Sequence, residues 1–242
     1  MATSPVKEFL RTHFMSEKCY NEFFVNLHFM HVPCLTIVLS KTVGFWIILD
    51  TLMAQLPQVL KIMRRGSAAG LSLTAVLLQL YAISCPVVYC MANNFPRFAW
   101  AERLFTLVQT VVIGFLILHY RGDTLKGLMF LLAYSGIMFL LGSYATAAVV
   151  STMQASSVAA LVASKVIQAG TNYSNGSTGQ LSSISVFLVW ASSLALIFVS
   201  LQDTGRSLNT LAHILSACLS CILLGQLFCY RKSSSAGKQK SE

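Results

Sequence analysis

Two ionisable residues, Asp50 and Lys165, stand within long apolar stretches of the sequence, where a charge is costly. Residues 124–202 contain no Asp or Glu, and their only basic residues are Lys126 and Lys165. A charged side chain at bilayer depth costs about 2.5 kcal/mol or more and usually faces a bundle interior or a path through it. Asp50 either lines such a path or is an acid kept neutral or hydrogen-bonded within the bundle. Lys165 either binds an anionic group or extends its ammonium toward the membrane surface.

No arrangement of residues in the sequence is typical of a metal site or a cofactor site. His28 and His31 are one helical turn apart, but no acid or third ligand completes a metal site. The seven cysteines form no recognisable disulfide or zinc framework. We therefore expect no metal and no cofactor.

Composition places the chain in a membrane. Of its 242 residues, 55% are hydrophobic and 10% are charged, whereas soluble domains carry about 25% charged residues. A spanning helix needs roughly 20 mainly apolar residues. The stretches that qualify are 42–62, 71–92, 99–119, 126–145, 147–169, 181–201 and 208–230. Residues 19–39, which Pro33 and Glu22 interrupt, favour an interfacial or partly embedded helix. The sequence thus predicts an all-α polytopic membrane protein with about seven spans.

Basic residues mark one side of this membrane protein. That side collects Lys61, Arg64, Arg65, Arg121, Lys126, Arg231, Lys232, Lys238 and Lys240. Because short loops rich in Lys and Arg are typical of the cytosolic side, we place these residues and the C-terminus there. The net charge of +9 then fits anionic lipid headgroups better than nucleic acid.

Two further features bear on localisation. Lys238 and Lys240 match the K-x-K-x-x pattern of membrane proteins retrieved to the endoplasmic reticulum, a signal that is read only on a cytosolic tail. The glycosylation sequons at Asn172 and Asn175 fall on the same side, so we expect them to be unmodified. The sequence thus predicts a multi-pass protein of the endoplasmic-reticulum membrane.

An internal repeat organises the spans. One shift superposes Leu71–Ser72 on Leu181–Ser182 and Tyr120–Arg121 on Tyr230–Arg231. Each repeat therefore contains three helices, and one extra span connects them so that the two repeats run parallel. We predict, in order, an N-terminal interfacial segment, a first repeat, a connector helix, a degenerate second repeat and a cytosolic basic tail, at residues 1–38, 39–120, 121–146, 147–231 and 232–242.

The first repeat carries a Pro-Gln pair at the end of its first span. Pro57 lacks an N–H and its ring opposes a preceding carbonyl, so it should kink the helix and provide a hinge. Gln58 could satisfy the freed backbone or contact a polar headgroup. Gly70 permits a tight turn before the second span, which begins after Ser72.

The second repeat departs from this pattern. Val59–Leu60 match Val166–Ile167, which places Ser164 and Lys165 at the positions of Pro57 and Gln58. We therefore expect the second repeat to lack a matching hinge.

The Pro57–Gln58 stretch resembles the signature of the PQ-loop family, which includes SWEET sugar transporters and cystinosin-type lysosomal exporters. Further segments are similar to one branch of this family along nearly the whole chain: residues 17–20, 31–35, 93–96, 119–122, 171–173 and 175–182. The resemblance implies two parallel SWEET-like three-helix repeats joined by a connector. It also implies an endoplasmic-reticulum protein required for lumenal use of dolichyl-phosphate-mannose and dolichyl-phosphate-glucose in N-glycan precursor assembly, GPI anchors and other mannosylation.

Three mechanisms remain open for such a protein. It could bind or reorient the lipid-linked sugars, serve as a non-transporting chaperone or scaffold for lumenal glycosyltransferases, or carry small solutes as SWEET proteins do. A solute carrier needs a wet central cavity with facing polar residues, and the sequence offers few candidates. An enzyme is not expected, because the lumenal loops offer only Glu102 and Asp203 as acids besides those of the N-terminus.

Several polar residues are candidates for contact with the lipid phosphate or the path. They are Lys61, Arg64, Arg65, Asp50, Lys165, Asn172, Asn175 and Gln180. The first three either attract a phosphate at the cytosolic mouth or anchor the span. The last three form a polar loop that either contacts headgroups or is simply hydrated.

Overall fold

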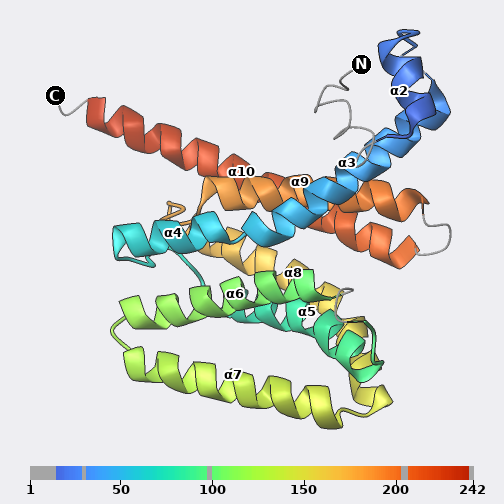
Figure 1. Cartoon of the computed structure of the whole chain (residues 1–242). Helices are drawn as coiled ribbons and strands as arrows, with labels where there is room; N and C mark the ends of the chain where they lie inside the picture. The colour runs from blue at the N-terminus through green and yellow to red at the C-terminus, as the bar shows by residue number, and fades with distance from the viewer. Residues whose placement is uncertain (1–14, 29–30, 97–99, 203–206, 240–242) are drawn as a thin grey trace. The chain divides into compact units, whose positions relative to one another are not determined.

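The computed structural model describes residues 15–28, 31–96, 100–202 and 207–239, and all of its regular elements in these ranges are α-helices. They are α2 (Glu17–Phe24), α3 (Val32–Met53), α4 (Leu56–Arg65), α5 (Leu73–Ala92), α6 (Ala101–Tyr120), α7 (Thr124–Tyr144), α8 (Ala147–Ser174), α9 (Ser183–Gln202) and α10 (Ser207–Gln239) (Figure 1). Within these ranges, seven segments are long and apolar enough to cross a membrane: α3 with α4, and each of α5 to α10. The prediction of an all-α polytopic membrane protein is confirmed.

Residues 1–49 form a compact unit of their own. Ser16 caps α2 by accepting a hydrogen bond from the backbone N–H of Cys19. Cys19 and Cys34 form a disulfide that joins α2 to the first turn of α3, and a small apolar cluster surrounds it. The sequence shows no recognisable disulfide framework and did not predict this pair, because the fold of this segment brings together two cysteines that no spacing rule pairs.

The first long helix begins earlier than predicted. Residues 32–39, which the sequence assigned to an interfacial helix, belong to α3. Pro33 lies in the first turn of α3, where a missing N–H leaves no hydrogen bond unmade, so it starts the helix instead of interrupting it. Because α3 ends at Met53, the predicted span at 42–62 is divided between α3 and α4.

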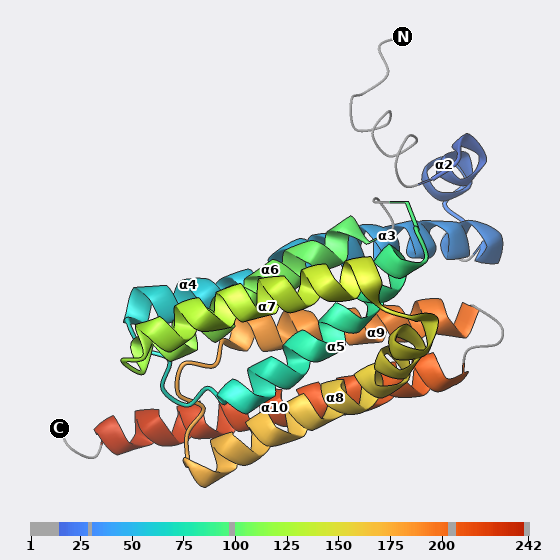
Figure 2. The same cartoon turned by 90° about the horizontal axis from the view of Figure 1, so that it is seen from below.

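Residues 50–242 form a second compact unit, which contains the packing between the two repeats. In the first repeat α6 packs against both α4 and α5, and in the second α10 packs against both α8 and α9. The third helix of each repeat thus lies between the other two. The connector α7 packs on α5 and α6, and the long contact of α5 with α8 joins the repeats (Figure 2).

One end of this unit, which we name the α4 end, carries the C-terminus of α4, the α6–α7 turn and the two interhelical loops 66–72 and 175–182 (Figures 1 and 2). The two loops have the same construction. Gly66 and Gly176 both have a φ of +58°, which glycine adopts at little cost. Ser72 and Ser182 then cap α5 and α9 by accepting hydrogen bonds from backbone N–H groups further along the chain. The repeat detected in the sequence is therefore a repeat of loop geometry as well.

Candidate functional site

The first helix of the first repeat is broken beside Pro57. The break lies around Gln55, between α3 and α4, and Pro57 occupies the first turn of α4. Gln109 of α6 bridges the break, since its Nε2 donates to the Leu52 carbonyl at 2.8 Å and its Oε1 accepts from the Gln55 N–H at 3.2 Å. The backbone groups freed by the break are thus satisfied by α6, and Gln58 has another role.

Gln58 holds the loop of the other repeat. Its Nε2 donates to the Gln180 carbonyl at 3.0 Å, and its Oε1 accepts from the Ser182 N–H at 2.6 Å. The side chain is 4% exposed, so these bonds form away from solvent. Both expected roles, repair of the broken backbone and contact with a headgroup, are replaced by a hydrogen-bonded link between the two repeats.

Gln168 makes the reciprocal link. Its Nε2 donates to the Gly70 carbonyl at 3.0 Å, and its Oε1 accepts from the Ser72 N–H at 3.1 Å. Each repeat therefore supplies one glutamine that grips the loop of the other, and we call Gln58, Gln168 and these four bonds the glutamine clamp. The counterpart of Gln58 is Gln168, and the expectation that Lys165 takes that position is wrong.

The internal repeat of the sequence, taken without a gap, identifies Gln168 as the counterpart of Gln58. The shift that superposes Leu71–Ser72 on Leu181–Ser182 also superposes Gln58 on Gln168 and Gly66 on Gly176 without any gap. The pairing of Val59–Leu60 with Val166–Ile167 requires extra residues in the loop of the second repeat, and it obscured this match. The second repeat does lack the proline, and α8 accordingly runs unbroken from Ala147 to Ser174.

The two loops also touch directly inside the clamp. The Gln180 N–H donates to the Ala69 carbonyl at 2.9 Å. A Cβ built on Gly70 would lie 2.8 Å from the Gly179 Cα, and one built on Gly179 would fall on the Ala69 carbonyl oxygen. Only glycine permits this approach, since both residues also have positive φ. The loops and the clamp together close the α4 end of the interface between the repeats.

Gly179→Ala is expected to lower the stability of the fold by about 2 kcal/mol or more, because it adds a backbone clash to an unfavourable φ. Gly136→Ala, in the middle of α7 with no atom within 4 Å of a Cβ there, is the matched control and should keep the stability or raise it by up to about 1 kcal/mol, because alanine favours a helix over glycine. Thermal unfolding in detergent compares them. Equal unfolding temperatures for the two variants would show that the loop contact is not tight.

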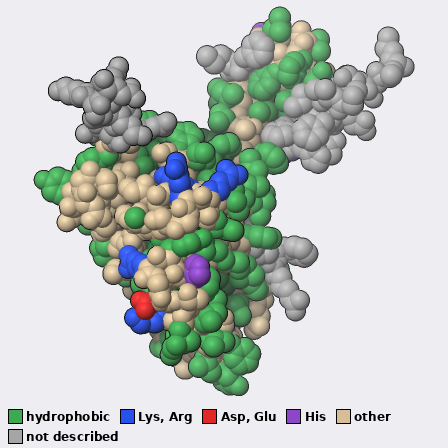
Figure 3. Space-filling model, turned by 90° about the vertical axis from the view of Figure 1, so that its left-hand side faces the viewer, with side chains coloured by type: hydrophobic (Ala, Val, Ile, Leu, Met, Phe, Trp, Pro, Cys, Tyr) green, Lys and Arg blue, Asp and Glu red, His purple; other side chains and the backbone are tan. Residues whose placement is uncertain are grey.

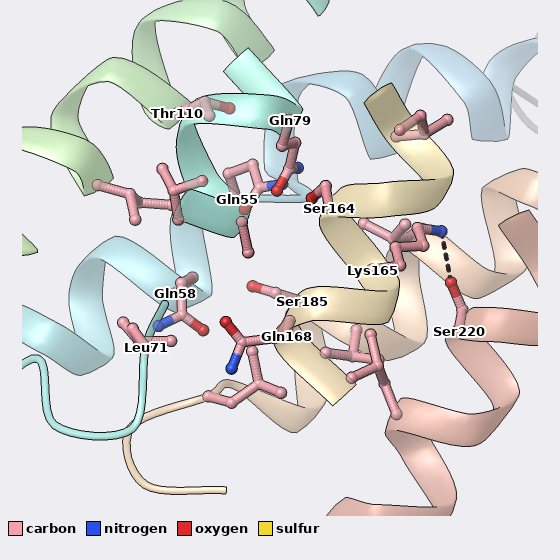
Figure 4. Close-up of a pocket in the computed structure, with 18 residues that line it drawn as sticks. Gln55, Gln58, Leu71, Gln79, Thr110, Ser164, Lys165, Gln168, Ser185 and Ser220 are labelled. Carbon is pink, nitrogen blue, oxygen red and sulfur yellow. Dashed lines mark hydrogen bonds between the residues drawn. The ribbon is translucent and has the colours of Figure 1, made fainter. Parts of the chain in front are cut away.

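A cavity lies between the repeats, next to the clamp, and both polar and aliphatic side chains form its wall. Its volume is about 100 Å³, enough for several water molecules. Its polar lining consists of Gln55, Gln58, Gln79, Thr110, Ser164, Lys165, Gln168, Ser185 and Ser220 (Figure 4). The hydroxyl of Ser185 is buried and has no hydrogen-bond partner among the described residues, and Figure 4 shows it directed into the cavity. The expectation of few facing polar residues is therefore wrong.

Lys165 is the charged residue of the cavity wall. The side chain is 8% exposed and does not reach the membrane surface. Its Nζ donates to the Ser220 hydroxyl at 2.7 Å, and to the Ser216 hydroxyl and carbonyl at 2.6 and 3.0 Å, so it is directed toward α10 (Figure 4). All three acceptors are uncharged. Among the described residues that line the cavity there is no carboxylate to balance the ammonium.

Asp50 is not part of this cavity. It is 7% exposed in the last turn of α3, and its Oδ1 has no hydrogen-bond partner among the described residues. The buried hydroxyl of Ser192, on α9, lies beside the Asp50 carboxyl group. Asp50 therefore faces the bundle interior, as expected, and its role in lining a path stays a prediction.

The polar loop predicted around Asn172 is largely internal. Asn172 is fully buried in the last turns of α8, where it accepts from Gln168 and donates to the Gln226 side chain at 2.9 Å. It therefore supports the clamp and does not face headgroups. Gln180 contributes backbone groups to the clamp, while Asn175 is exposed after the end of α8.

The other predicted basic residues gather at the α4 end. Figure 3 shows Lys and Arg side chains on this face, with little acidic surface among them. Lys61, Arg64 and Arg65 line a groove of about 550 Å³ beside α4, and Lys61 donates to the Leu181 carbonyl at 2.7 Å. Of the predicted retrieval signal, Lys240 lies outside the described residues, and Lys238 is placed only by its backbone in α10.

Comparison with known sequences supports the motif. Residues 39–98 match the family described as PQ loop repeat, a family that covers transporters and related membrane proteins. The match spans α4, α5 and most of α3, so it includes the helix break, Pro57, Gln58 and the loop with Gly70. No solved structure matches the chain.

Proposed function

We propose that this chain is an endoplasmic-reticulum membrane protein that binds dolichyl-phosphate-mannose and dolichyl-phosphate-glucose and carries their phosphate–sugar head groups across the bilayer. The sequence segments beyond the matched repeat resemble the mannose-P-dolichol utilization defect proteins of the PQ-loop family along nearly the whole chain. Members of that branch are required for lumenal use of these two lipids. The path of the head group is the interface between the two repeats.

The observation that carries the proposal is a cavity between the repeats whose wall holds several polar side chains and, among the described residues, a cation without a counter-ion. A phosphodiester needs a positive charge and hydrogen-bond donors, while a sugar needs both donors and acceptors. Lys165, four glutamine amides and several hydroxyls supply these groups. An ammonium without a counter-ion is costly in a bundle, and such residues commonly mark a substrate path. The isoprenoid tail, which is purely apolar, stays in the lipid.

Passage of a head group requires a change of conformation. The cavity of about 100 Å³ is smaller than the roughly 300–1,000 Å³ of ordinary ligand sites. The glutamine clamp closes its α4 end, and the break around Gln55 allows α4 to move separately from α3. We infer that opening releases the clamp through rotation of α4 about this break.

The proposed orientation places the α4 end in the cytosol. Basic residues gather at this end, as the positive-inside rule requires of a cytosolic face. The Cys19–Cys34 disulfide comes before the first span in the chain, at the start of α3, whereas Arg64 and Arg65 follow that span, and disulfides form in oxidising compartments such as the lumen. Two independent features therefore favour the same orientation, and with it a cytosolic C-terminus.

The test uses purified full-length protein in sealed liposomes and follows transbilayer movement of a short-chain dolichyl-phosphate-mannose analogue. The wild-type protein should accelerate movement over empty liposomes. Pro57→Ala should slow it about two- to fivefold, because alanine restores a backbone donor and stiffens the break. Pro33→Ala, in the first turn of α3, is the matched control and should leave the rate unchanged. Folded protein that gives no acceleration would indicate a scaffold for glycosyltransferases instead.

A second candidate function is supported by the same cavity. A SWEET-like carrier of small solutes needs facing polar residues at the centre of the bundle, and Gln79, Thr110 and Ser185 provide them. The same liposomes loaded with labelled free mannose or glucose separate the two functions. Release of free sugar without movement of the lipid-linked analogue would establish the solute carrier.

A further inference from the structure

The groove beside α4 lies on a different side of this helix from the clamp. Its lining consists of Met53, Leu56, Pro57, Leu60, Lys61, Arg64, Arg65, Ser182 and Ile184. The buried face of α4 is formed by Gln58, Val59 and Ile62, which point into the bundle. The groove therefore does not belong to the central cavity, although α4 forms a wall of both.

Apolar and basic residues are separated along this groove. The apolar residues come from the end of α3, the first turns of α4 and the start of α9, and Leu60 and Ile184 are 40% and 63% exposed. The basic residues follow at the C-terminal end of α4. A groove with an apolar floor and a basic end matches one membrane lipid, with its chain on the floor and its phosphate at the cations.

The charge of Arg64 and Arg65 is not balanced by any residue that the structure describes. Arg64 and Arg65 make no hydrogen bond or ion pair with any residue that the structure describes, and no acid is among the groove residues. Lys61, whose Nζ donates to the Leu181 carbonyl, adds a third positive charge. Guanidinium groups bind phosphate oxygens in a bidentate manner, and basic pockets between helices near the cytosolic leaflet bind anionic headgroups.

We propose that this groove is a binding site for one anionic glycerophospholipid of the adjoining leaflet, whose phosphate contacts Arg64 and Arg65. The site is distinct from the path of the lipid-linked sugar and does not depend on it. A lipid seated here holds α4 against the start of α9. Because Ser182 lines the groove and also donates its N–H to Gln58, the bound lipid stabilises the closed clamp.

The experiment is native mass spectrometry of the full chain released from nanodiscs of phosphatidylcholine, with and without phosphatidylinositol. We expect one retained phosphatidylinositol per chain and an apparent affinity that falls about tenfold or more in Arg64→Gln/Arg65→Gln. Lys126→Gln removes an exposed basic residue at the same end, paired with Asp123 at 3.0 Å, and should retain the lipid. The unfolding temperature in phosphatidylcholine alone shows that each variant is folded.

Three outcomes would overturn the proposal. Equal retention by the double arginine variant places the lipid elsewhere on the surface. Equal retention of phosphatidylcholine shows that the groove solvates lipid without recognising charge. Retention of dolichyl phosphate, but of no glycerophospholipid, assigns the groove to the substrate.

Discussion

Lys165→Met is expected to slow movement of the lipid-linked sugar across the liposome bilayer by about tenfold or more. The reason is that the cavity wall loses the positive charge that attracts the phosphate. The same change should not lower the stability of the protein. The ammonium is buried against uncharged oxygens, and replacing an unbalanced buried charge by an apolar chain of similar length removes a desolvation cost. Translocation rate and unfolding temperature, measured on one preparation, check both statements.

Lys126→Met is the matched control for this prediction. It removes a lysine that is exposed and paired with Asp123, where a surface ion pair contributes little to stability. Its translocation rate should equal that of the wild type. If Lys165→Met also transports at the wild-type rate, the phosphate does not depend on Lys165. If it unfolds, its serine contacts are structural and the assigned role is wrong.

Gln58→Leu is expected to lower the free energy of unfolding by about 2–4 kcal/mol, since it leaves the Gln180 carbonyl and the Ser182 N–H without partners at a buried site. Hydrogen exchange of the Ser182 amide should accelerate with it. Gln58→Glu keeps the acceptor for Ser182 but sets a second oxygen against the Gln180 carbonyl at a buried site. When ionised it should therefore cost at least as much as leucine, because the carboxylate is desolvated there. Thermal unfolding and exchange mass spectrometry measure the series.

Gln168→Leu should resemble Gln58→Leu, because each glutamine holds the loop of the other repeat. The double variant should lose less stability than the sum of the two, since both loops are released once either is freed. Gln154→Leu, at an exposed position on α8, is the control and should be neutral. Strict additivity of the two clamp variants would show that the loops are held independently.

The sequence predicted the features that depend on periodicity and spacing along one chain. Apolar stretches of sufficient length located the spans, and the Leu-Ser and Tyr-Arg pairs located both repeats and the extra helix between them. The errors at helix ends have local causes. Proline disrupts a helix interior but is favourable in a first turn. Apolar content alone does not show that Pro33 lies in a first turn.

The site was harder to predict because its members come from different helices. Gln79, Thr110 and Ser185 are scattered polar residues in mainly apolar helices, and nothing in their own neighbourhood shows that they face one another. Gln168 was predictable from the undisturbed repeat, where it superposes on Gln58. The disulfide was not, since its formation depends on how the short α2 folds back on the start of α3.

The central claim is that the head group of a lipid-linked sugar enters the cavity between the repeats. Photolabelling tests it most directly, with a dolichyl-phosphate-mannose analogue that carries a diazirine on the sugar, followed by peptide mapping of the labelled residues. We expect labels near Gln79 on α5, near Lys165 on α8 and near Ser185 on α9, and competition by the unmodified analogue. Labels confined to the outer faces of the helices, or labels that the competitor does not reduce, would contradict the account.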